Sequence, residues 1–233
     1  MAEQNHSGRQ FVKYNFYKVD PQWRRLPHAE KERGKAEFGA VVAEFSSRLT
    51  VNSYSLVGLR ADADFMLWLI SPTLEHLQEM AAQLSRTGLG QYLTTPYAYL
   101  AMTRKSDYVK THRHPGQEGT RETIKPLGRK YLFVYPFVKT HQWYQLPMEE
   151  RQKMMNEHFT LGHKYPSVKI NTTYSFGIDD QDFVVGFETD SPSDFLELVM
   201  EMRSSQARPY TVRDTPIFTC VKRPLEECLE ALG

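Results

Sequence analysis

Two stretches far apart in the chain share one pattern. Residues 11–27 read FVKYNFYKVDPQWRRLP, and residues 131–147 read YLFVYPFVKTHQWYQLP. In both, an aromatic and β-branched run typical of a strand precedes Trp-x-x-Leu-Pro, with Trp23 and Trp143 at equivalent places. Because a recurring pattern indicates a recurring structural unit, the sequence predicts two copies of one fold.

The likeness continues through both halves. The paired motifs are Tyr54-Ser-Leu-Val-Gly with Tyr174-Ser-Phe-Gly, Asp64-Phe with Asp182-Phe, and Ser71-Pro with Ser191-Pro. Periodicity in the second half predicts strands over 131–138, 168–177, 182–189 and 215–221, and helices over 147–164 and 192–203. The first half contains a matching helix over 27–47. The order βαββαβ is the ferredoxin-like unit, so we expect an α+β fold of two repeats, with antiparallel sheets and outer helices.

Each predicted helix of the second half begins with a recognisable signal. Pro147 opens the first helix, and Glu149 and Glu150 put negative charge at its N-terminus. Ser191 and Pro192 form a capped start for the second helix, with proline at the first helical position. The recurring motifs predict repeats at 1–103 and 129–233. The polar segment 104–128 between them is either a functional lid or a flexible linker.

Composition narrows the function classes. The chain has 233 residues, a net charge of +1 and 40% hydrophobic residues, which is typical of a globular protein without a nucleic-acid footprint. The N-terminal sequence has no signal-like apolar region, and no apolar run would span a membrane. Because Cys220 and Cys228 are the only cysteines, a reducing cytoplasm is expected. Aromatics at 12% suit either a large flat ligand or an aromatic core.

The two halves differ in chemistry along the first long helix. Phe38 lies about where the second half has His158. His158 follows two methionines by one turn and precedes Gly162 by four residues, so it shares an apolar helix face with an open position. Such a histidine is either a haem-iron ligand or a core residue with satisfied hydrogen bonds. His163 is a competing ligand, but it points to another side of the helix.

The preceding strand carries a second candidate group. With period-2 alternation, Tyr135, Phe137 and Lys139 share one face of the sheet. A phenol and an ammonium on one face indicate a site for an acidic group. The alternative is a core tyrosine and a lysine that extends to solvent at the end of the strand.

These residues carry a resemblance to a known family. The stretch YPFVKTHQWYQLPMEERQKMMNEH (135–158) resembles the coproheme decarboxylases of the chlorite dismutase superfamily, with a Tyr-Pro pair, a lysine four residues after the tyrosine, an aromatic pair, Leu-Pro and a histidine helix. Residues 168–203 are similar to the same family. The resemblance is strong over 131–219 and extends to the whole chain through the repeat.

The resemblance implies a dimeric α+β barrel subunit assembled into a cytoplasmic homopentamer. The implied reaction uses hydrogen peroxide to decarboxylate two propionates of iron coproporphyrin III (coproheme) and gives haem b through a three-propionate intermediate. By position, His158 is the iron ligand and Tyr135 is the radical tyrosine that takes hydrogen from a propionate. Lys139 and Arg203 hold propionates. No nucleic-acid or membrane partner is expected.

One departure bears on the alternatives. Chlorite dismutases carry an arginine just after the Val-Lys pair, where this chain has Ile170 and then Asn171. Chlorite dismutase or weak peroxidase activity is therefore the second interpretation, and a non-enzymatic haem carrier or sensor is the third, against which Tyr135 argues. The group that deprotonates peroxide stays open, with His112, His114 and Glu118 of the central loop as candidates.

Overall fold

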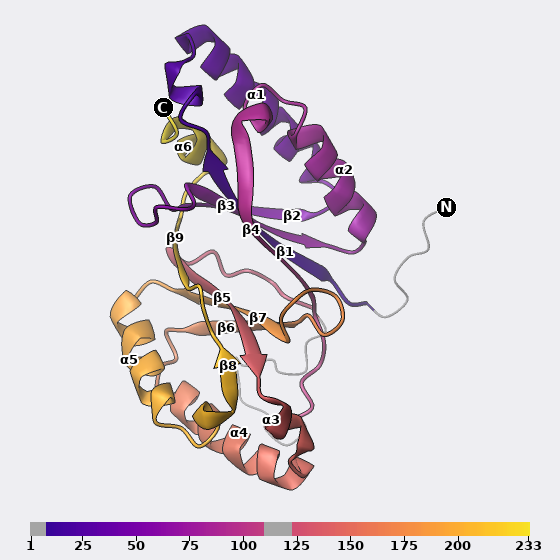
Figure 1. The fold of residues 1–233 in the computed structure, drawn as a ribbon, viewed down its shortest axis with the longest axis vertical. Helices are drawn as coiled ribbons and strands as arrows, with labels where there is room; N and C mark the ends of the chain where they lie inside the picture. Colours follow the sequence, from indigo (N-terminus) through magenta and orange to yellow (C-terminus); the bar gives the residue numbers. More distant parts are fainter. Residues whose placement is uncertain (1–7, 110–122) are drawn as a thin grey trace. The chain divides into compact units, whose positions relative to one another are not determined.

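A computed structural model describes residues 8–109 and 123–233. Their contacts divide the chain into two compact units, one containing the described residues up to Met102 together with Thr219–Gly233, and the other spanning Thr103–Phe218. Figure 1 labels the helices and strands of each unit. Within the described ranges, no helix is long and apolar enough to cross a membrane.

The first unit is an antiparallel sheet covered by helices on one face (Figure 1). Its strands lie in the order β4-β1-β3-β2-β9. The elements are β1 (Phe11–Val19), α1 (His28–Phe45), β2 (Thr50–Ser55), β3 (Phe65–Ser71), α2 (Leu74–Leu84), β4 (Leu93–Met102), β9 (Phe218–Lys222) and α6 (Leu225–Glu230). A dense apolar cluster fills the space beneath α1, where Trp23 and Phe38 are completely buried.

The second unit repeats this plan. Its strands lie in the order β6-β7-β5-β8, and each neighbouring pair in that order is antiparallel. The elements are β5 (Tyr131–Lys139), α3 (His141–Gln145), α4 (Met148–His163), β6 (Lys169–Tyr174), β7 (Phe183–Thr189), α5 (Pro192–Arg203) and β8 (Thr211–Arg213). Phe195 of α5 stacks on Phe133 of β5 at 4.0 Å between ring centroids, so α5 packs on the aromatic face of this sheet. The duplicated ferredoxin-like α+β class is confirmed.

The end of the chain departs from the predicted order. The strand expected over 215–221 begins at Phe218, and a separate short strand, β8, precedes it. Residues 219–233 fall in the first unit, although the predicted second repeat ran from 129 to 233. The physical reason is tertiary, because β9 pairs with the distant strand β2 and the apolar side chains of α6 join the core beneath α1.

The helix starts of the second unit agree in part with the predicted signals. Pro147 is the residue before α4, and Glu149 and Glu150 lie in its first turn. Pro192 begins α5, as expected. The predicted cap by Ser191 is wrong, because its side chain makes no capping hydrogen bond and its hydroxyl contacts that of Ser193 at 2.9 Å.

Candidate functional site

Tyr135 lies on the helix-covered face of the second unit's sheet. It pairs across the sheet with Val185 of β7, and its ring stacks on Phe187 with 5.7 Å between centroids. Burial is the main reason that the pKa of the Tyr135 phenol lies far above its usual range. The phenol is therefore protonated at neutral pH and is held by aromatic packing, so its hydroxyl hydrogen is retained in the resting protein.

Lys139 ends the same strand, and its ammonium is enclosed by aromatic rings. Its Nζ lies 4.2 Å from the ring centroid of Trp143 and 5.3 Å from that of Phe137, and it donates a hydrogen bond to the carbonyl of Ala207 at 3.1 Å. Burial first, and then repulsion from Arg208, lower the pKa of Lys139 to about 8. The ammonium is therefore poorly solvated and ready to take an anionic partner.

His158 lies in the C-terminal half of α4 and is partly exposed. Loss of solvent contact, and then repulsion from Lys139, lower its pKa to about 4. At neutral pH, His158 is therefore a neutral imidazole that is desolvated but still accessible, which is the form that binds a metal ion.

The position one turn after His158 is close to the sheet. Gly162 is buried, and a Cβ added there would lie 3.9 Å from Cδ1 of Ile170 on β6. At that distance an added Cβ would be in ordinary van der Waals contact with Ile170, so there is room beside the isoleucine at position 162. The predicted opening at Gly162 is thus bordered by an aliphatic side chain.

The two residues of β6 at which a chlorite dismutase arginine was expected, Ile170 and Asn171, differ in exposure and in the face of the sheet that they occupy. Ile170 is 38% exposed, whereas Asn171 is buried and donates its amide hydrogen to Glu188 at 3.0 Å. Because successive side chains of a strand point to opposite faces, Ile170 is the one on the side of Phe187, its cross-strand partner. No guanidinium occupies position 170 or 171. The three loop residues considered as peroxide bases, His112, His114 and Glu118, lie outside the described residues.

Arg203 ends α5 and belongs to a charged cluster beside Tyr135. Its Nη1 donates to Oδ2 of Asp214 at 2.8 Å, and Nη1 of Arg208 donates to the same oxygen at 2.5 Å. Asp214 raises the pKa of the Tyr135 phenol further, while the two arginines oppose that rise. Arg203 was predicted, but Arg208 and Asp214 were not, because the turn that carries them has no periodic pattern.

The structure supports the comparison of the two halves around His158. In each unit, a glutamate of the long helix accepts a backbone N–H from the loop after the second helix: Glu37 from Gly88 at 2.7 Å, and Glu157 from Gln206 at 2.9 Å. The residue after each glutamate is Phe38 in the first unit and His158 in the second. Phe38 is completely buried, so the same position carries core packing in one unit and a titratable, accessible ring in the other.

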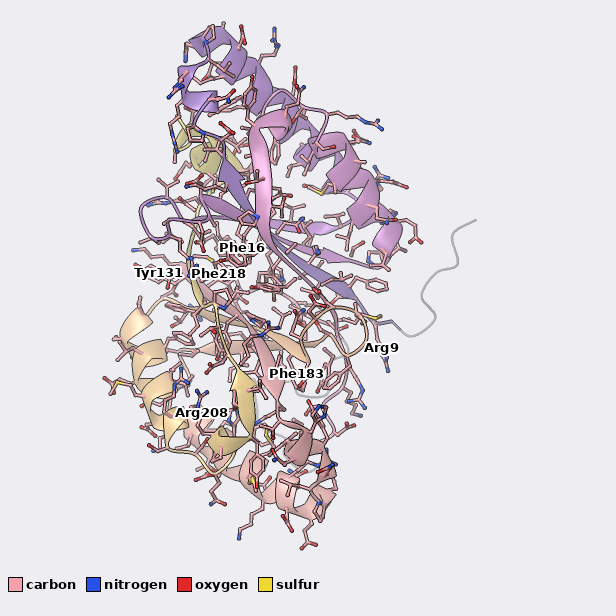
Figure 2. The ribbon with its side chains drawn as sticks, in the orientation of Figure 1. Arg9, Phe16, Tyr131, Phe183, Arg208 and Phe218 are labelled. Atoms are coloured by element: carbon pink, nitrogen blue, oxygen red, sulfur yellow. The ribbon has the colours of Figure 1, made fainter. Side chains whose placement is uncertain are left out.

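The second unit thus brings all four predicted site residues into one region of the fold. Tyr135 is influenced by Arg203, and His158 is influenced by Lys139. Figure 2 labels Arg208 between α5 and β8, on the segment that also supplies the acceptor for Lys139. A neutral imidazole, a protonated phenol and several cations in one unit suit a ligand that combines a metal ion with carboxylates.

The sequence of this chain is similar to that of known proteins. The family model for chlorite dismutase matches residues 31–223. The coproheme decarboxylase of Mycolicibacterium smegmatis (strain ATCC 700084 / mc(2)155) is 32% identical over 180 residues, which is 77% of this chain and 75% of that protein.

Solved structures are similar over nearly the whole chain. Chlorite dismutase from Candidatus Nitrospira defluvii in complex with imidazole is 29% identical, with a TM-score of 0.85 over 95% of this chain and 94% of that one. A heme-binding protein from Thermus thermophilus is 26% identical, with a TM-score of 0.84 over 96% of this chain and 94% of that one. The chain belongs to the chlorite dismutase family.

Proposed function

We propose that the protein is a coproheme decarboxylase that uses hydrogen peroxide to convert two propionates of iron coproporphyrin III into vinyl groups, giving haem b. The observation that carries this proposal is that one unit holds the Tyr135 phenol against Phe187, the Lys139 ammonium against Trp143 and the accessible His158 imidazole on α4. A relative of this chain bears that name at 32% identity. The porphyrin is the substrate, and the products are haem b, carbon dioxide and water.

His158 is the proposed ligand of the substrate iron. A pKa of about 4 keeps its ring nitrogens free of an extra proton at neutral pH, so a lone pair is available to the metal. The same position in the first unit holds Phe38, which has no donor atom. Only the second unit is therefore expected to bind the porphyrin iron through this helix position.

Lys139 and Arg203 are the proposed partners of the substrate carboxylates. The Lys139 ammonium donates to the carbonyl of Ala207 and lies against aromatic rings, and the nearby carboxylate of Asp182 only partly opposes the fall of its pKa. We expect a propionate to give the ammonium a direct ionic partner. The guanidinium of Arg203 is 43% exposed and uses Nη1 for Asp214, so its remaining N–H groups are able to bind a carboxylate.

Tyr135 is the proposed relay between the oxidant and the propionate. For each group, R–CH2–CH2–COO⁻ + H2O2 + H⁺ gives R–CH=CH2 + CO2 + 2 H2O, so peroxide takes up the two electrons that leave the side chain. Once Tyr135 has been oxidised to a phenoxyl radical, it takes a hydrogen atom from the propionate β-carbon and becomes a phenol again. Loss of one further electron and of carbon dioxide completes the vinyl group. Proximity to the reacting bond is the requirement that Tyr135 must meet.

The two alternative functions, chlorite turnover and non-enzymatic haem carriage, explain fewer of the side chains at the site. Chlorite chemistry at this fold is expected to need a cation beside the iron, and the position that faces α4 is the aliphatic Ile170. A non-enzymatic haem carrier has no use for a protonated phenol beside two arginines. We therefore place both behind the decarboxylase proposal.

The proposal extends to compartment and assembly. Cys220 and Cys228 are both buried and are not joined to each other by a disulfide, which agrees with a reducing cytoplasm. A homopentamer is the expected assembly, and light scattering of the purified protein tests it.

Mass spectrometry of the porphyrin tests the function. The protein is loaded with iron coproporphyrin III, titrated with hydrogen peroxide and quenched at intervals. We expect a three-propionate intermediate followed by haem b. Consumption of peroxide with destruction of the porphyrin and without haem b would contradict the proposal.

A further inference from the structure

One carboxylate holds two arginines in place beside Tyr135. Arg203 lies at the end of α5, Arg208 begins the 3-10 helix Arg208–Tyr210, and Asp214 follows β8. Both guanidiniums donate through Nη1 to Oδ2 of Asp214, at 2.8 Å and 2.5 Å. The Asp214 side chain is 16% exposed, so this pairing is more sheltered than an ordinary surface salt bridge.

The fold itself does not require an arginine at position 208. The same turn occurs in the first unit, where Tyr92 N–H bonds to the carbonyl of Leu89 as Tyr210 N–H bonds to that of Ala207. The residue there that corresponds to Arg208 is Gly90, whose added Cβ would lie 1.9 Å from the carbonyl oxygen of Leu84. The first turn therefore has no room for a side chain at this place, whereas the second turn carries Arg208, which reaches Asp214. The pairing with Asp214 is thus a feature of the second unit alone among the two turns.

We propose that Asp214 is a positioning residue that fixes Arg203 and Arg208 for the substrate carboxylates and limits the positive charge that faces Tyr135. This inference rests on the proposed function. It assigns a role to a carboxylate that the reaction scheme does not otherwise use.

The charges at the site predict whether loss of the Asp214 carboxylate raises or lowers the affinity for porphyrin. Two guanidiniums and one carboxylate sum to one positive charge, so converting the carboxylate to an amide leaves two positive charges beside the substrate. Tetracarboxylate porphyrins are then held more strongly, while the arginines lose their common anchor. Asp214→Asn is therefore expected to bind porphyrin more tightly and to decarboxylate it more slowly, a combination that simple loss of structure does not produce.

Binding of metal-free coproporphyrin III measures the effect without iron or peroxide. We expect Asp214→Asn to bind this probe about three- to tenfold more tightly at low salt, with the difference shrinking as salt is added. Asp214→Glu keeps the charge and is expected to restore wild-type affinity. Asp190→Asn is the matched control, because it removes an exposed carboxylate paired with Arg129 and changes the net charge equally. We expect that control to stay within about twofold of wild type.

A double variant that restores the charge balance tests the proposal even if Asp214→Asn alone does not fold. Arg208→Gln alone is expected to weaken probe binding, and Asp214→Asn with Arg208→Gln restores the single positive charge and is expected to return the affinity to near wild type. Equal or weaker binding by Asp214→Asn would overturn the proposal. So would a double variant that binds no better than Arg208→Gln, and this comparison decides the matter if Asp214→Asn alone fails to fold.

The kinetics with coproheme separate this inference from the proposed function. If wild-type protein makes haem b, Asp214→Asn is expected to show a lower KM and a lower kcat. If wild-type protein makes none, the proposed function fails, while the affinities for metal-free coproporphyrin III still decide whether Asp214 sets the charge of the site.

Discussion

Raising the pH from 7 to 9 is expected to remove the charge of Lys139. Burial and the neighbouring Arg208 lower the pKa of this ammonium to about 8, so the cation is present below that pH and is lost above it. By the ordinary titration relation, the charged fraction is about 0.9 at pH 7, about 0.5 at pH 8 and about 0.1 at pH 9. The porphyrin propionates stay ionised over this range.

The affinity for metal-free coproporphyrin III is therefore expected to fall by about fivefold between pH 8 and pH 9, and by about ninefold between pH 7 and pH 9, as protonation linkage requires of a group that binds only when charged. Fluorescence quenching between pH 6.5 and 9.5 measures it. Lys139→Met keeps an unbranched side chain against Trp143 and removes the ammonium, so it is expected to bind weakly with no change across the range. A wild-type curve parallel to that of Lys139→Met would refute the assignment of Lys139 to a carboxylate.

Three further outcomes are expected. His158→Ala is expected to retain porphyrin but lose the iron–histidine band in the resonance Raman spectrum of the ferrous complex, whereas His163→Ala keeps it; an unchanged band in the first variant rules out His158 as the ligand. Arg203→Ala is expected to weaken coproheme binding by one to two decades, the equivalent of roughly 1.5–3 kcal/mol for a charged hydrogen bond, and wild-type affinity would exclude a propionate contact. Chlorite turnover is expected to be negligible because Ile170 stands where a cation is needed, and sustained oxygen release measured with an oxygen electrode would contradict this.

Strong periodicity made much of the second unit predictable. The aromatic run of β5 was expected over 131–138 and ends one residue later, and α5 occupies its predicted range of 192–203. Short elements were missed because three to six residues carry too little pattern. The strand β8 and the helix α6 are of this kind, and tertiary pairing and packing stabilise both.

The site was predictable only where local sequence sets the geometry. Alternation along β5 predicted that Phe137 and Lys139 share a face, and the Lys139 ammonium lies 5.3 Å from the Phe137 ring centroid. The repeat predicted that His158 and Phe38 occupy equivalent positions, and the hydrogen bonds of the preceding glutamates agree with this. The bonds from Arg203 and Arg208 to Asp214 join the end of a helix to a turn and a strand end. Such contacts depend on the tertiary arrangement of a helix end, a turn and a strand end, so the periodicity of the sequence does not predict them.

Replacement of Tyr135 by phenylalanine tests whether this phenol is the relay to the propionate. Phenylalanine keeps the ring that stacks on Phe187 and removes only the hydroxyl, so a circular dichroism melt is expected to match wild type. Mass spectrometry of the porphyrin after peroxide addition is the measurement. We expect Tyr135→Phe to bind coproheme normally, consume peroxide and bleach the porphyrin, with almost no haem b. Haem b formed at near the wild-type rate would show that Tyr135 is not the relay and that another aromatic side chain takes this part.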